Sequence, residues 1–226
     1  MRVFVLYPHT DISNLCGEKK MKTSRDILRV FLCGAHSTGK TTLLTDLGKA
    51  VRIHGEPEVA RKVIKDMGLT REHLDYKKNP KAFEDLQLKI LDAQCETERR
   101  NAEAGRDYIA DRGIDPVVYA DVCLGEDAKQ RLLGSHQAKE CIERYKTSLV
   151  FVLTPHQECI KDDGFRMMGT LEELQRYTVA MTTILHENDI PFTLIRDLDR
   201  QKRVQTVREK ILEMRPDLGA EGCDNN

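Results

Sequence analysis

The amino-acid sequence predicts an α/β fold in which a parallel sheet lies between two layers of helices. Short apolar segments alternate with segments whose apolar residues recur at helical spacing. The segment at residues 149–153 is apolar throughout, as expected for a parallel strand that is buried on both faces. A glycine-containing loop directly follows the first apolar segment, residues 27–33. Loops at the carboxyl ends of such strands gather at one edge of the sheet, and we expect ligands to bind there.

That first loop carries the Walker A pattern G-x-x-x-x-G-K-[ST]. In this pattern the glycines let backbone N–H groups point inward to the phosphates, and the following helix adds the positive end of its dipole. Lys40 is expected to reach the β- and γ-phosphates, and the Thr41 hydroxyl to coordinate Mg²⁺. We therefore predict a P-loop NTPase fold with a nucleoside triphosphate and Mg²⁺ as cofactors. The expected nucleotide-binding residues are Gly34, Ala35, His36, Ser37, Thr38, Gly39, Lys40, Thr41 and Thr42.

ATP is the expected nucleotide. The sequence contains neither N-K-x-D nor T-K-x-D, the short motifs with which many GTPases read guanine. Kinase-like folds bind bases by other means, so GTP stays open as an alternative.

The remaining elements follow in order along the chain. After the phosphate-loop helix we expect a turn with a short strand before Glu58, and then helices, strands and one capping box, Thr170 to Glu173. A charged stretch at residues 126–146 is predicted to be one surface helix. The other expected helices are at residues 61–67, 80–103, from Asp115 onward, from Thr170 to about Asn188, and 200–214, and the other strands at 108–110, 148–153 and 191–195.

The composition predicts one cytoplasmic domain, residues 27–214, between a flexible extension (1–26) and a flexible tail (215–226). The 36 basic and 37 acidic residues nearly cancel, so nucleic acid is not an expected partner. No apolar run approaches the roughly 20 residues of a membrane helix. The seven cysteines form no C-x-x-C pair, which argues against a disulfide framework or a zinc site.

Two further candidates for catalysis adjoin the strand at residues 108–110. Asp111 stands where a Walker B carboxylate belongs and is expected to bind Mg²⁺ directly or through water, and Arg112 is expected to face anions.

Glu58 and Arg61 form E-x-x-R, which fits a base and a phosphate-binding cation. The same spacing also fits an ordinary salt bridge at a helix start.

A polar loop that contains Lys161, Asp162, Asp163 and Arg166 is expected to close over the nucleotide as a lid. Arg166 is the expected clamp on the transferred phosphoryl group, since Gly and Phe precede it in this loop. Lys161 and Arg176 fit a solvated charged surface equally well. Gln94, on the apolar face of its helix, is expected to bind neighbouring protein groups or ligand.

Taken together, these motifs resemble the AAA-type P-loop domain family related to the nicotinamide riboside kinase domain of bacterial NadR. The resemblance runs from about residue 28 to 214 and implies a nucleotide-kinase-like, three-layer αβα fold that binds ATP or GTP with Mg²⁺. The positions that it assigns to the site are 34–42, Glu58, Arg61, Asp111, Arg112, Asp163 and Arg166.

Two functions remain open from the sequence. In the first, the protein is a kinase for a nucleoside or other small metabolite, with Lys40, Arg112 and Arg166 stabilising the phosphoryl group and Glu58 or Asp111 as the base. In the second, it is a nucleotide-dependent switch that a protein partner or a second copy reads.

Overall fold

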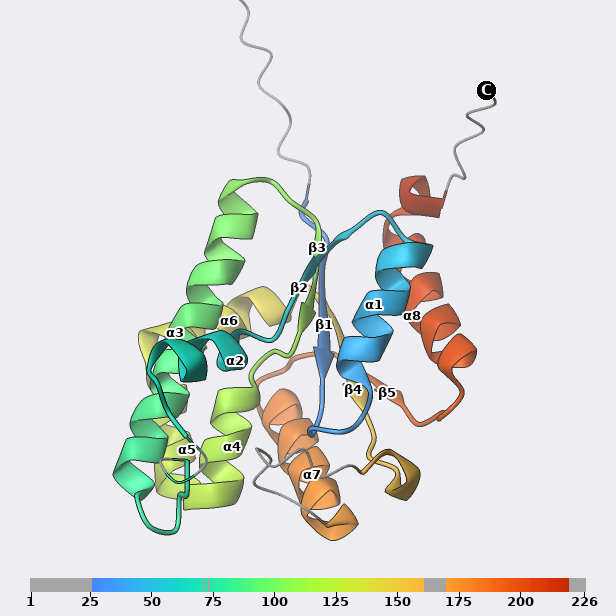
Figure 1. Ribbon diagram of the computed structural model, residues 1–226. Helices are drawn as coiled ribbons and strands as arrows, with labels where there is room; N and C mark the ends of the chain where they lie inside the picture. Colours follow the sequence, from blue (N-terminus) through green and yellow to red (C-terminus); the bar gives the residue numbers. More distant parts are fainter. Residues whose placement is uncertain (1–25, 71, 73, 161–169, 220–226) are drawn as a thin grey trace, which may run out of the picture.

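A parallel sheet of five strands forms the centre of the protein, in the order β2-β3-β1-β4-β5. The computed structural model describes residues 26–219 apart from 71, 73 and 161–169 (Figure 1). The α/β fold class is confirmed, and the strand expected before Glu58 is present as β2. The strands are β1 (Arg29–Cys33), β2 (His54–Glu56), β3 (Tyr108–Asp111), β4 (Leu149–Leu153) and β5 (Thr193–Ile195).

Alternate residues of the central strand β1 face two separate hydrophobic cores. Val30 and Leu32 pack with one helix layer, and Phe31 and Cys33 pack with the other. The first layer is α1 (Lys40–Ala50) and α8 (Arg200–Met214), and the second is mainly α3 (Pro80–Glu103), α4 (Asp115–Leu124), α6 (His136–Tyr145) and α7 (Leu171–Glu187) (Figure 1). The expected three-layer αβα sandwich is therefore confirmed. A smaller apolar cluster joins α2 (Val59–Asp66) to α3.

The prediction of a single surface helix over residues 126–146 is wrong. The structure has two helices here, α5 (Glu126–Leu133) and α6, with Gly134 and Ser135 between them. The Ser135 hydroxyl accepts a hydrogen bond from the backbone N–H of Ala138 at 3.2 Å, so it caps a new helix. Cys141, Ile142 and Tyr145 of α6 are buried in the core, although the neighbouring charged residues made this stretch look like a surface helix.

The capping box of α7 is confirmed. The Thr170 hydroxyl accepts from the backbone N–H of Glu173 at 3.2 Å, and the Glu173 carboxylate accepts from the backbone N–H of Thr170 at 3.0 Å. The short helices η1 (Gln157–Cys159) and η2 (Pro216–Gly219) complete the described chain. Residues 215–219, expected as part of a flexible tail, contact the domain, since Arg215 donates to Asp107 at 2.7 Å.

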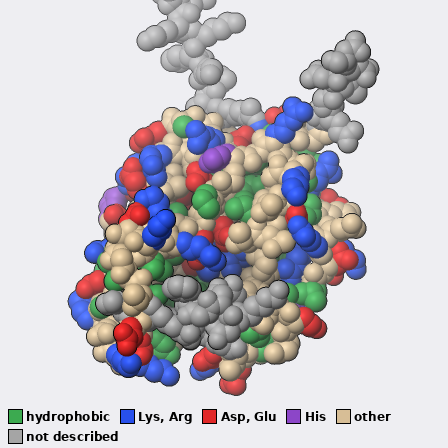
Figure 2. All heavy atoms as spheres, viewed as in Figure 1, with side chains coloured by type: hydrophobic (Ala, Val, Ile, Leu, Met, Phe, Trp, Pro, Cys, Tyr) green, Lys and Arg blue, Asp and Glu red, His purple; other side chains and the backbone are tan. Residues whose placement is uncertain are grey.

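Acidic and basic side chains are interspersed over the face shown in Figure 2, as the balanced composition predicts. None of the helices in the described ranges is long and apolar enough to cross a membrane.

Candidate functional site

The phosphate loop joins β1 to α1 through a backbone that requires glycine at two positions. Gly34 has φ +129°, and a Cβ atom there would lie 2.6 Å from the carbonyl oxygen of Leu153 in the neighbouring strand. Gly39 has φ +88°, also in the region that glycine favours. Residues 34–39 form the loop itself, and Lys40, Thr41 and Thr42 begin α1. The Walker A residues thus have the strand-loop-helix setting that the motif requires.

Lys40 lies under this loop and is only 5% exposed. Its Nζ donates to the carbonyl oxygens of Gly34 at 2.8 Å and Ala35 at 2.6 Å. The pKa of Lys40 is lowered from 10.5 to about 8, mainly because the side chain is buried and also because the Arg112 guanidinium is nearby. A bound polyanion would favour the charged form and raise that pKa again.

Thr41 and Asp111 meet at the carboxyl ends of β1 and β3. The Thr41 hydroxyl donates to Asp111 Oδ2 at 2.5 Å. The other carboxylate oxygen, Asp111 Oδ1, is buried and has no hydrogen-bond partner within the described chain. An orphaned carboxylate oxygen beside a hydroxyl fits Mg²⁺, a hard cation that prefers oxygen ligands. The described residues contain no cluster of three or more His, Cys, Asp or Glu side chains with metal-binding geometry, so phosphate and water would have to complete such a site.

Glu58 and Arg112 form a largely buried ion pair at the ends of β2 and β3. Arg112 Nε donates to Glu58 Oε1 at 2.7 Å, and the two side chains are 11% and 14% exposed, respectively. Burial alone would raise the pKa of Glu58, but Arg112, Arg61 and Lys40 outweigh it and lower that pKa to about 2. Glu58 is therefore ionised at neutral pH. Since Glu58, Asp111 and Arg112 all act on the charge of Lys40, they share one electrostatic site with it.

The alternative interpretation of Glu58 and Arg61, an ordinary salt bridge, describes a contact that the structure contains. Arg61 Nε donates to Glu58 Oε2 at 2.8 Å in an i,i+3 salt bridge, and the Arg61 side chain is 71% exposed. Glu58 thus belongs to the buried site, whereas Arg61 lies at its rim.

Asp115 and Tyr177 belong to this site, although sequence reasoning gave them no role in it. Asp115 accepts from Arg112 at 3.0 Å, from the backbone N–H of Gly113 at 2.8 Å and from the Tyr177 hydroxyl at 2.7 Å. Arg112 is held between Glu58 and Asp115, with its own backbone at φ +100°. The signal for Asp115 is an acidic residue four positions after Asp111, at the predicted start of a helix.

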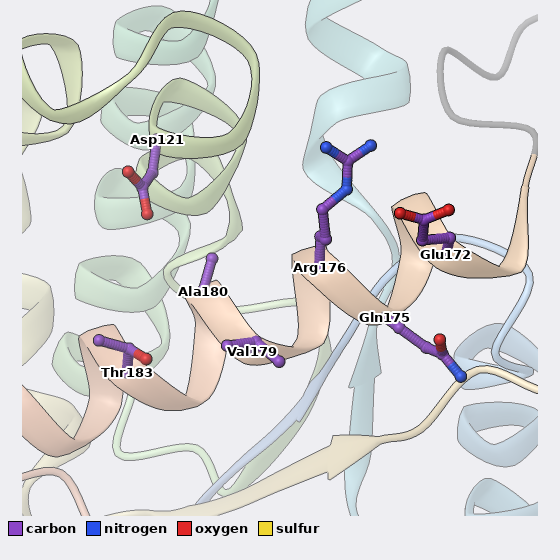
Figure 3. A pocket seen from close by; sticks show the side chains of 7 residues that line it. All are labelled: Asp121, Glu172, Gln175, Arg176, Val179, Ala180 and Thr183. Carbon is purple, nitrogen blue, oxygen red and sulfur yellow. The ribbon is translucent and has the colours of Figure 1, made fainter.

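The other candidates lie elsewhere in the chain or outside the described residues. Lys161, Asp162, Asp163 and Arg166, the expected lid, lie outside the described residues. Arg176 is exposed and lines an open groove between α4 and α7, where Figure 3 shows it extending from α7 on the same side as Glu172. Gln94 donates to Glu98 at 3.3 Å and to the Tyr145 hydroxyl at 3.2 Å, so its amide binds protein groups.

Solved kinases share this fold. NadR in complex with NR is 21% identical with a TM-score of 0.67, and the match covers 88% of this chain and 53% of that one, about half its length. Deoxyadenosine kinase from M. mycoides, with dCMP and dCDP bound, is 16% identical with a TM-score of 0.58 over 82% and 100% of the two chains. Shikimate kinase from Acinetobacter baumannii, in complex with shikimate, is 12% identical with a TM-score of 0.54 over 84% and 95%. At these identities the similarity shows a nucleotide-kinase-like P-loop fold.

No curated protein sequence matches the chain. The model of an AAA domain family, however, matches residues 29–215, which run from the first residue of β1 to the residue that follows α8. This range contains the phosphate loop, the Thr41–Asp111 contact and the Glu58–Arg112 pair. Since the match spans most of the chain, the protein belongs to this AAA domain family, with a kinase-like P-loop fold that it shares with NadR.

Proposed function

We propose that the protein is a kinase that transfers the γ-phosphoryl group of ATP to a hydroxyl of a small metabolite, with Mg²⁺. The observation that carries this proposal is the largely buried Glu58–Arg112 pair beside the phosphate loop. Arg112 Nη1 also lies 3.5 Å from the Gly34 carbonyl oxygen, so the pair adjoins the loop directly. Nucleotide binding alone needs no carboxylate at this place, whereas an acceptor hydroxyl needs an acceptor for its hydrogen bond.

Positioning and charge would do most of the catalytic work. The transition state of phosphoryl transfer is loose and spreads negative charge over the equatorial oxygens, which favours cations held around it. Lys40 and Arg112 supply two such cations from fixed positions, and we propose Arg166 as a third. Mg²⁺, held by Thr41 and Asp111, would neutralise charge on the β- and γ-phosphates.

Glu58 would orient the acceptor hydroxyl. With a pKa of about 2, its carboxylate is ionised and can accept the hydrogen bond, but it is a weak base. A loose transition state needs little deprotonation of the nucleophile before the phosphoryl group arrives. In this proposal Glu58 fixes the direction of attack first and takes the proton late.

The test is the Mg²⁺-dependent release of ADP from ATP, and of GDP from GTP, by the purified protein. Each reaction is run with and without a pool of nucleosides, deoxynucleosides, shikimate and nicotinamide riboside. A metabolite-dependent rise supports the kinase, and fractionation of the pool then identifies the acceptor.

Two variants of α1 make the test specific. Lys40→Ala removes the phosphate-loop cation and should abolish the rise, whereas Lys49→Ala changes an exposed lysine of the same helix and should keep it. Tight nucleotide binding without any metabolite-dependent rise would contradict the kinase and favour a switch that acts through a protein partner.

A further inference from the structure

Arg203 is a buried cation that neither the motifs nor the Glu58–Arg112 pair account for. It lies on α8, on the same buried stripe as Val207 and Ile211, and is only 5% exposed. Within the described chain, no salt bridge joins Arg203 to a carboxylate; the nearby Asp197 carboxylate favours its charge without pairing with it, and burial lowers the pKa of Arg203. Burying a guanidinium without a paired counter-charge is costly, so its position calls for a reason beyond packing.

The contacts of Arg203 join two loops of the site. Its Nη1 donates to the carbonyl oxygen of Thr38, in the phosphate loop, at 2.7 Å. Its Nε donates to the carbonyl oxygen of Asp197, in the connection between β5 and α8. The third nitrogen, Nη2, is buried and has no hydrogen-bond partner among the described residues. Arg203 therefore holds the phosphate loop to the β5–α8 connection and keeps one donor unused.

The contact with Thr38 fixes a particular peptide plane. In a trans peptide the C=O and the N–H point in opposite directions, so anchoring Thr38 O on Arg203 turns the N–H of Gly39 away from Arg203. In a Walker A loop the inward-pointing N–H groups are the ones that bind phosphate. Gly39, with φ +88°, has a backbone free enough to need such an anchor.

We infer that Arg203 is a positioning residue for nucleotide binding, holding the Thr38–Gly39 peptide with its N–H toward the phosphates and placing a second cation behind the loop. The inference rests on the proposed nucleotide-binding function. It adds to Lys40 a cation from the opposite end of the chain, and it makes the β5–α8 connection part of the nucleotide site.

The test measures the binding of Mg²⁺-ATP by calorimetry and the thermal midpoint without nucleotide, for the full chain and four variants. We expect Arg203→Gln to bind about tenfold more weakly, the equivalent of one charge-assisted hydrogen bond. Arg203→Lys, which keeps the charge, should recover part of that loss. The matched control is Arg200→Gln, because Arg200 is an exposed residue of the same helix that pairs with Asp46 of α1.

The fourth variant, Lys40→Ala, separates the two proposals. If the wild type binds no nucleotide, or Lys40→Ala binds as tightly as the wild type, the proposed function fails and the role of Arg203 fails with it. If the wild type binds, Lys40→Ala does not, and Arg203→Gln binds within about twofold of the wild type, Arg203 has only a structural role and this inference alone is overturned.

Hydrogen exchange of the wild type covers the case in which Arg203→Gln does not fold. Nucleotide should slow exchange in residues 34–41 and also in residues 196–203, which Arg203 joins to them. Slower exchange in residues 34–41 alone would overturn the inference.

Discussion

Replacing Glu58 by glutamine tests the electrostatics of the site without any substrate. The variant keeps the size of the side chain and removes the charge that faces Arg112, Arg61 and Lys40. The pKa of Glu58 falls from 4.5 in the unfolded chain to about 2 in the folded protein. At about 1.36 kcal/mol per pKa unit, these roughly 2.5 units correspond to about 3 kcal/mol of stability at neutral pH.

The pH dependence has a definite sign. Because the folded-state pKa is lowered, the contribution is fully present above pH 4.5 and is lost as the pH falls toward 2. At pH 3 the same linkage leaves about 1.4 kcal/mol, roughly half. The difference in unfolding free energy between the wild type and Glu58→Gln should therefore be up to about 3 kcal/mol at pH 7 and about half of that at pH 3.

Urea unfolding followed by far-UV circular dichroism measures this difference, since the chain has no tryptophan to report by fluorescence. The control is Glu213→Gln, which breaks an exposed pair with Lys210 and should cost less than about 0.5 kcal/mol at either pH. A Glu58→Gln variant as stable as the wild type at pH 7, or a difference that does not change with pH, would refute the reasoning.

Three further predictions concern the phosphate loop and its neighbours. At pH 9 most Lys40 side chains are neutral, because the pKa of Lys40 is about 8. Nucleotide binding at this pH should therefore take up nearly one proton per molecule, which makes the binding enthalpy measured by calorimetry depend on the buffer. The Lys40→Arg variant should lack this dependence. Asp111→Asn should lower the affinity of the nucleotide complex for Mg²⁺ about tenfold and leave the affinity for Mg²⁺-free nucleotide nearly unchanged. Mg²⁺ titration measures the first quantity. Equal losses of both affinities would contradict the role of Asp111 as a ligand. Gly34→Ala should lower the free energy of unfolding, measured with urea, by more than about 2 kcal/mol, because its Cβ would lie 2.6 Å from the Leu153 carbonyl oxygen. Gly48→Ala, at an open position of α1, should raise it by about 0.5 kcal/mol. A Gly34→Ala variant as stable as the wild type would show that the loop can shift.

Much of the fold could be predicted because its signals are local. The Walker A loop must be contiguous to surround a phosphate, and the capping box of Thr170 and Glu173 spans a single turn. The helix expected at residues 200–214 has those bounds in the structure. The predicted strand at residues 108–110 is present as β3, and Asp111 and Arg112 at its end contact the phosphate-loop region, since parallel strands end at one edge.

What the sequence did not reveal depends on contacts between distant residues. Arg203 and Thr38 are 165 positions apart, and Tyr177 and Asp115 are 62 apart. An amphipathic helical pattern assigns charged side chains to the solvent-facing side of a helix. It therefore gave no sign that Arg203 is buried on the same side of α8 as Val207 and Ile211. The helix break at Ser135 could not be predicted for a related reason: a capping serine within a polar stretch does not differ in polarity from its neighbours.

The position of β1 at the centre of the sheet divides the chain into two parts that can change separately. On the β3 and β2 side, one continuous stretch of chain supplies Glu58, Asp111 and Arg112. On the β4 and β5 side, the far end of the chain supplies Arg203. On the proposed assignment, mutations around Glu58 give related proteins a new phosphate acceptor, while Lys40, Asp111 and Arg203 keep the nucleotide in place.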